Sequence, residues 1–350
     1  MSVMISLKDC HPNPSSDLDH SPNTGILVSL AHNSSTITAF NLLKTLQKSS
    51  SDTSLTGTMR FQLPSDPGSS GYDGIPGVEF PYLPNGLSSV VGSCNGILCL
   101  YNQEISLCNF SIRRRLIVPR LRCLKPYVKV ALGFGFDPVA DDYKIVSVYP
   151  AGYELDGSNA YIFSLKTESW SAIPSPFTRF DHVKLQRACF FNGILHWVVV
   201  GYLTTEKLSF FILTFNLSSH VFGHILLPKT WTIRKITAIK GRLAVVSWGG
   251  GGTWIWVMKV YGKAESWCLR YVPETRGASN LIDVFQPIPN GNVFAYCRGS
   301  KVHNLKTGRC TQGMKFGPFS DVGMEMYVES LELVDKESAT AFGKTVVSWK

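Results

Sequence analysis

A repeated pair of short motifs constrains the fold of this chain more than any other feature of its sequence. The first motif is a polar turn followed by an apolar strand, written NGILCL at residues 95–100 and NGILHW at residues 192–197. Related copies begin at positions 24, 141, 240 and 290. A repeat of roughly 40 to 50 residues is typical of propellers and solenoids.

The second motif is a hairpin, in which an apolar strand runs into a polar turn and a further strand. Its turns are centred on positions 41, 109, 164, 216, 261 and 304, which are 68, 55, 52, 45 and 43 residues apart. The largest gap contains residues 64–86, of which thirteen are Pro, Gly or Ser, and we interpret this segment as a loop insertion. Six copies remain, each long enough for about four short strands.

These copies predict an all-β fold. A single sheet of this kind cannot bury both faces, whereas six sheets in a radial arrangement can. We therefore predict a six-bladed β-propeller over residues 24–342, preceded by a disordered tail at 1–23 and followed by a tail at 343–350. Residues 326–333 alternate as a strand should, and we expect them to pair with the N-terminal blade and close the ring.

The charge distribution leaves two interpretations open. The net charge is +9, although only 17% of residues are charged, and residues 105–136 and 207–264 contain basic residues but no acid. Such tracts could attract nucleic acid or an acidic partner. They could equally form a solvated basic surface that keeps the protein soluble.

The cysteines and the long apolar stretches indicate a soluble protein of a reducing compartment. The nine cysteines lack the spacing of a metal site or a disulfide framework. Residues 188–205 and 208–228 are uncharged, but polar residues interrupt their centres, as in paired strands rather than membrane spans. We expect a cytoplasmic or nuclear location, or both, and no membrane partner.

Searches for catalytic and cofactor motifs are negative. Four glycines at 249–252 precede the letters TWIWV instead of the Lys-Ser/Thr of a phosphate loop, so we interpret them as a hairpin tip. His220 and His224 have a metal-ligand spacing for a helix, but they fall in a predicted strand-turn-strand without companion ligands. We predict no catalytic residue, no metal and no cofactor, and therefore no enzyme.

Four motifs resemble those of a known family. The letters VVGSCNGILCL at 90–100, GFGFDP with DDYKIV at 133–146, FNGILHW at 191–197 and YVESL at 327–331 occur in the order found in the F-box-associated domain of plant F-box proteins, a kelch-type propeller-like domain. The motifs also have local readings. Asn-Gly at 95–96 and 192–193 suits a turn with positive φ, and Asp137-Pro138 starts a loop. We expect three tryptophans to pack between blades: Trp170, Trp197 and Trp267.

The resemblance implies a module that recruits a protein substrate to an SCF-type E3 ubiquitin ligase. Family members usually begin with an F-box, which has a Leu-Pro start and a tryptophan and binds the Skp1 adaptor. Residues 1–23 have neither feature, so we expect a Skp1-type adaptor as partner only if an F-box exists upstream. The alternatives are an F-box-less propeller scaffold, a basic-patch nucleic-acid binder and, ranked last, a propeller enzyme.

Candidate partner-binding residues follow from the enrichment of Trp, Tyr and Arg at interfaces. Three arginines are predicted in the hairpin turn of the second copy, and two tryptophans flank the glycine turn: Arg113, Arg114, Arg115, Trp248 and Trp254. Plain surface charge for the arginines and core packing for the tryptophans remain alternatives.

Overall fold

The structure is a computed structural model that describes the following residues: 26–31, 36–41, 58–62, 89–102, 104–109, 112, 114–121, 130–150, 159–174, 179–183, 187–202, 208–228, 233–239, 241–249, 252–271, 284–287, 292–296, 300–304, 310–311, 322–327, 330–333 and 337–341. The predicted tails at 1–23 and 343–350 and the predicted insertion at 64–86 lie outside this part of the chain. Two compact units are present, one formed by Met1–Val118 with Pro318–Lys350 and the other by Pro119–Gly317.

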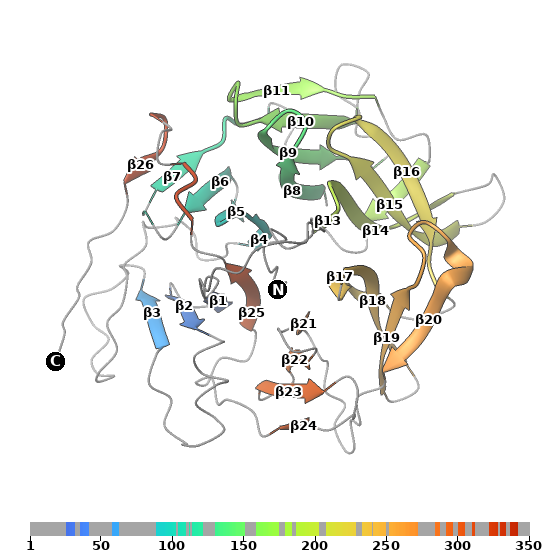
Figure 1. Cartoon of the computed structure of the whole chain (residues 1–350). Helices are drawn as coiled ribbons and strands as arrows, with labels where there is room; N and C mark the ends of the chain where they lie inside the picture. Colours follow the sequence, from blue (N-terminus) through green and yellow to red (C-terminus); the bar gives the residue numbers. More distant parts are fainter. Residues whose placement is uncertain are drawn as a thin grey trace, which may run out of the picture. The chain divides into compact units, whose positions relative to one another are not determined.

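The first unit contains two antiparallel sheets (Figure 1). Sheet 1 has the order β25-β1-β2-β3, with β25 at Val322–Tyr327, β1 at Ile26–Ala31, β2 at Thr36–Asn41 and β3 at Thr58–Gln62. Sheet 2 has the order β26-β7-β6-β5-β4, with β26 at Thr340–Ala341, β7 at Arg114–Ile117, β6 at Glu104–Asn109, β5 at Ile97–Asn102 and β4 at Ser89–Cys94.

The second unit contains four more antiparallel sheets. Sheet 3 consists of β8 (Ala131–Asp137), β9 (Asp142–Val148), β10 (Ala160–Ser164) and β11 (Ser169–Ala172). Sheet 4 consists of β12 (Arg179–Val183), β13 (Cys189–Phe191), β14 (Ile194–Tyr202), β15 (Leu208–Asn216) and β16 (Val221–Leu226). Sheet 5 consists of β17 (Ile233–Ile239), β18 (Arg242–Gly249), β19 (Gly252–Met258) and β20 (Trp267–Tyr271), and sheet 6 of β21 (Val284–Pro287), β22 (Asn292–Tyr296), β23 (Ser300–Asn304) and β24 (Cys310–Thr311).

The sheets confirm the all-β class, but they are less uniform than six equal four-stranded units. Four of them have the expected four strands, and sheets 2 and 4 have five. Sheet 2 gains the C-terminal strand β26, which pairs with β7 at one edge. In sheet 4 one edge is divided, because the short strands β12 and β13 both pair with the nine-residue β14.

The C-terminal segment pairs with the N-terminal strand, although the predicted strand bounds are wrong. β25 runs antiparallel to β1, with Tyr327 opposite Ile26. β25 ends at Tyr327, and residues 330–333 lie outside any strand, with Leu333 in a turn at a φ of 72°. The side-chain amide of Asn109 donates to the carbonyl oxygens of Ser330 and Glu332 at 3.1 and 2.8 Å, and so fixes this segment against sheet 2.

Both Asn-Gly turns have the predicted backbone conformation. Asn95 and Gly96 have φ values of 46° and 80°, and Asn192 and Gly193 have values of 51° and 73°. Asn and Gly occupy this left-handed region at the lowest cost. Each pair therefore reverses the chain into the strand that follows it, which is β5 in one case and β14 in the other.

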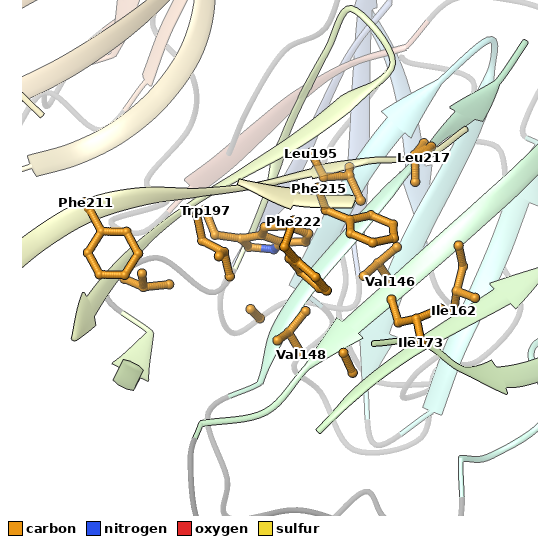
Figure 2. Close-up of a cluster of buried hydrophobic side chains, with 14 residues drawn as sticks. Val146, Val148, Ile162, Ile173, Leu195, Trp197, Phe211, Phe215, Leu217 and Phe222 are labelled. Atoms are coloured by element: carbon orange, nitrogen blue, oxygen red, sulfur yellow. The ribbon is translucent and has the colours of Figure 1, made fainter. Parts of the chain in front are cut away.

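A dry hydrophobic core joins sheets 3 and 4 (Figure 2). Trp197 of β14 is fully buried there, and its indole N–H donates to the carbonyl oxygen of Leu132 at 2.9 Å. A Cβ atom at Gly133 would lie 2.7 Å from the Trp197 ring, and one at Gly135 would lie 2.4 Å from the Phe190 ring. The alternating glycines of the GFGF motif are thus a flat surface against which rings of the next sheet pack.

A second core joins sheets 4 and 5. Val198 and Ile225 of sheet 4 pack there with Val245 and Met258 of sheet 5, and partly buried aromatic side chains, including Trp267, line its border. The inter-sheet role predicted for Trp197 and Trp267 is confirmed.

The third predicted packing tryptophan has different contacts. Trp170 lies in β11, packs on Phe163 of its own sheet with ring centroids 5.5 Å apart, and donates to the carbonyl oxygen of Pro119 at 2.7 Å. In the described part of the chain, no helix has the length and apolar character needed to cross a membrane.

Candidate functional site

The turns at one end of sheets 3, 4 and 5 are joined into a continuous series by hydrogen bonds. The 138–141 turn contacts the 217–220 turn through Asp137 and Ser218. The 217–220 turn contacts the Asn-Gly turn of β14 through the amide of Leu217, which donates to Gly193 at 3.0 Å. Near the Asn-Gly turn in the sequence, His196 of β14 is hydrogen-bonded to Tyr261 in the 259–266 turn. Loops that a rigid scaffold positions in this way are common binding sites.

An ion pair between sheets 3 and 4 fixes the first of these junctions. The Lys144 ammonium lies 2.5 Å from a carboxylate oxygen of Asp137, and both side chains are buried. Its other two protons point to the carbonyl oxygen of Leu217 at 3.2 Å and to Nε2 of His220 at 3.2 Å. An ammonium group has three donors, so Lys144 is fully satisfied by one partner from its own sheet and two from the next.

The protonation states of this cluster follow from its contacts. Burial alone would raise the pKa of Asp137, but hydrogen bonds from Lys144, the Ser218 hydroxyl and the backbone N–H of Val139 outweigh it and lower that pKa below its usual value. Burial and the nearby Lys144 charge lower the pKa of His220. Asp137 is therefore ionised and His220 neutral at pH 7.

Asp142 fixes the next turn of sheet 3. Its carboxylate accepts hydrogen bonds from the Ser164 hydroxyl at 2.6 Å and from the backbone N–H of Lys166 at 2.9 Å. The polar residues of the DPVADDYK motif at 137–144 thus stabilise turns of sheet 3 and of the adjacent sheet 4.

A neutral histidine and a tyrosine form the junction between sheets 4 and 5. Nδ1 of His196 lies 3.1 Å from the carbonyl oxygen of Cys189, which can only accept, so Nδ1 carries the proton. Nε2 is then the acceptor for the Tyr261 hydroxyl at 2.8 Å. Burial lowers the pKa of His196 to about 4 and, chiefly through desolvation, raises the pKa of Tyr261 to about 12.

Apolar side chains project from these turns into solvent. We call them the turn surface: Val139, Val221, Val260 and Tyr261, which are 82, 61, 49 and 43% exposed. Apolar and aromatic groups on a rigid support are suited to contact another protein surface, because little conformational entropy is lost when they are covered. No group of three or more His, Cys, Asp or Glu that could hold a metal ion occurs among the described residues.

Two of the three predicted arginines lie in a strand rather than in a turn. Arg114 and Arg115 belong to β7, where they are opposite Ala341 and Thr340 of β26, and Arg113 lies outside the described residues. The Arg114 guanidinium donates to the carbonyl oxygen of Ala339 at 2.7 Å, so it helps to attach the fifth strand of sheet 2. Their role in partner binding stays a prediction.

The predicted tryptophans occupy the β18–β19 hairpin, which the glycine run closes as expected, with Gly249 opposite Gly252. Trp248 is paired with Thr253, and Trp254 with Ser247. Paired positions share a face and successive positions alternate, so the two tryptophan positions fall on opposite faces of sheet 5. The structure therefore does not bring them together as one site.

The turn surface was missed by reasoning from the sequence. Valines in or beside short turns carry no motif, and position 261 was noted only as the centre of a hairpin. A signal was available at the hairpin itself, because an aromatic residue between two lysines, KVYGK at 259–263, is unusual for a simple turn.

Comparisons with known proteins agree with the geometry. Residues 60–283 match the family model of the F-box associated beta propeller domain. The F-box/kelch-repeat protein At3g23880 of Arabidopsis thaliana is 27% identical over 63% of this chain and 62% of its own length. The Arabidopsis F-box protein At3g07870 is 30% identical over 52% of this chain and 50% of its own length, and Arabidopsis F-box protein CPR1 is 26% identical over 56 and 54%. The chain thus spans less than two thirds of each of these relatives.

A solved structure shares the fold at low sequence identity. A chain of the crystal structure of a nidogen/laminin complex superposes with a TM-score of 0.52 at 10% identity, over 87% of this chain and 99% of that one. Since the family model covers well over half of the sequence, the chain belongs to the F-box associated β-propeller domain family.

Proposed function

We propose that this protein recognises a protein substrate for an SCF-type ubiquitin ligase and has no catalytic activity of its own. The match of residues 60–283 to the F-box associated propeller family carries the proposal. The F-box proteins among its relatives support the ligase context. Binding of a Skp1-type adaptor belongs to this proposal only if an F-box exists upstream.

Two surfaces are candidates for the substrate contact. The first is the turn surface of the second unit, whose side chains are exposed on hydrogen-bonded turns. The second comprises the predicted arginines of the first unit, Arg113, Arg114 and Arg115. The six-bladed propeller and its ring closure by β1 and β25 also stay predictions.

We further propose that the protein resides in the cytoplasm or nucleus. Five of the described cysteines are thiols outside any disulfide: Cys94, Cys99, Cys108, Cys189 and Cys268. Burial raises the pKa of Cys108 to about 12 and that of Cys99 well above its usual value, so both thiols are protonated and unreactive.

Affinity capture from nuclease-treated plant extract tests the recognition function. The protein is compared with three variants: Val139→Asp/Tyr261→Ala for the turn surface, Arg113→Ala/Arg114→Ala/Arg115→Ala for the arginines, and Phe210→Ser as a matched control at an exposed apolar residue of β15 that belongs to neither surface. We expect a discrete set of proteins to be recovered by the unaltered chain and the control, and to be lost from one surface variant. Equal recovery by all four proteins would contradict the proposal, and capture that depends on nucleic acid would favour the nucleic-acid alternative.

A further inference from the structure

The turn between β19 and β20 is braced more extensively than an ordinary surface loop. The Ser266 hydroxyl accepts the backbone N–H of Val260 at 3.0 Å and lies 2.8 and 2.7 Å from the carbonyl oxygens of Val260 and Lys263. The Lys263 N–H donates to Val260, and the Lys259 N–H donates to Ser266. The turn ends in a short 3₁₀ helix, η2, at Ala264–Ser266. Its shape is therefore set before any partner arrives.

Tyr261 is held at this turn by its hydroxyl while much of its ring stays open. The hydroxyl donates to His196 at 2.8 Å, and the ring meets the imidazole edge-on with centroids 5.8 Å apart. Phe191 packs on a further side at 6.3 Å. Even so, 43% of the residue is exposed, next to Val260, which is 49% exposed. A fixed and open aromatic side chain is a low-entropy anchor for a ligand.

Basic side chains surround this anchor. Lys259 and Lys263 flank it in the sequence and are exposed. The guanidinium of Arg242, also exposed, donates to the carbonyl oxygen of Lys259 and so lies at the base of the same turn. The only acid within residues 259–266 is Glu265, which leaves an excess of positive charge around an apolar centre.

We propose that residues 259–263, together with Arg242, bind a short peptide segment in which an apolar side chain stands next to aspartate or glutamate. The apolar side chain covers Val260 and the Tyr261 ring, and the carboxylates pair with the flanking cations. His196 acts as a positioning residue, because its Nε2 fixes the tyrosine. This inference rests on the proposed recognition function and names the chemistry of the segment recognised.

Selection from a phage-displayed library of random peptides tests this assignment with the full chain as bait. We expect recovered peptides to be enriched in Asp and Glu beside Leu, Phe or Trp. A synthetic copy of one recovered peptide, titrated by fluorescence polarisation, should lose about tenfold or more in affinity with Lys259→Glu/Lys263→Glu and with Tyr261→Ala. Its affinity should also fall with added salt.

Two further variants separate this site from general charge and from misfolding. Lys166→Glu, at an exposed lysine on a sheet 3 turn, should leave the affinity within about twofold. Tyr261→Phe keeps the ring but loses the bond to His196. We expect a several-fold loss of affinity with the fold retained, while the melting temperature falls slightly because the buried Nε2 of His196 loses its donor. The proposal is overturned if the recovered peptides show no acidic bias, or if they bind Lys259→Glu/Lys263→Glu and Lys166→Glu alike. In that event, capture of a protein through the other surface would still support recognition as the function.

Discussion

The contacts on the two faces of sheet 4 consist of different kinds of side chain. Toward sheet 3, a fully buried tryptophan lies on a glycine surface, and a buried ion pair with three satisfied donors joins the turns. Toward sheet 5, the border consists of partly buried aromatic rings, and the polar link is a neutral His196–Tyr261 hydrogen bond. The side chains of the sheet 3–sheet 4 contact thus serve the fold alone. The sheet 4–sheet 5 contact also stabilises the fold, but it leaves side chains at its margin exposed to a partner.

Removing the central ring of the first contact should have the largest effect. Trp197→Ala deletes a buried indole together with its hydrogen bond to Leu132, and we expect unfolding free energy to fall by about 4 kcal/mol. Urea unfolding followed by circular dichroism measures the loss. The exposed control Val139→Ala should stay within about 0.5 kcal/mol of the unaltered protein, and a similar loss in both would contradict the assignment of the core.

Breaking the ion pair should rank second. Lys144→Met leaves the buried Asp137 carboxylate without its cation, and the expected loss at pH 7 is about 3 kcal/mol. Because the folded protein lowers the pKa of Asp137, its contribution is present above the unfolded value near 4 and is lost as the pH falls through the folded value. Adding Asp137→Asn should restore part of the lost unfolding free energy, as measured by urea unfolding. A double variant less stable than Lys144→Met would count against the ion pair.

Acid should weaken the second contact through His196. The folded state lowers its pKa from 6.5 to about 4, so stability is complete above pH 6.5 and falls as the pH drops toward 4. The loss between pH 7 and pH 5 is about 2 kcal/mol for this residue. In His196→Gln, the decrease in unfolding free energy between pH 7 and pH 5 should therefore be smaller by about that amount. His220→Gln, which alters a histidine at the other contact, is measured for comparison. An unchanged slope in His196→Gln would rule out a buried neutral imidazole.

A smaller side chain at the margin of the sheet 4–sheet 5 contact should lower the unfolding free energy least. Trp267→Phe keeps an aromatic ring but removes the indole N–H that donates to the carbonyl oxygen of Leu226 at 2.9 Å. We expect a loss of about 1 kcal/mol, visible as a small decrease in the urea midpoint. A loss as large as that of Trp197→Ala would mean that the two contacts do not differ in the way described.

The sequence allowed the framework to be predicted better than the surface. Asn-Gly turns, the Trp197 packing and the glycine hairpin tip all follow from local chemistry and repeat period, which a single sequence displays. The fifth strand of sheet 2 does not, because it places Thr340 opposite Arg115, far away in the chain. The fifth strand of sheet 4 does not either, because the repeat period does not show that β12 and β13 both pair with β14.

The candidate site was harder still. Arg114 was expected in a turn, but the strand β7 extends to include it. Tyr261 gains its fixed position from His196, 65 residues away, and no spacing rule predicts that contact.

The glycine surface on β8 has a consequence for how this family can change over time. A side chain at position 133 or 135 would collide with a ring carried by a different repeat, so the two positions cannot vary independently of positions 197 and 190. A descendant that gains an alanine at 133 is expected to survive only where the ring at 197 has already become smaller. Sheets 3 and 4 are therefore matched at this contact, and we expect the exchange of one of them without the other to destabilise the fold.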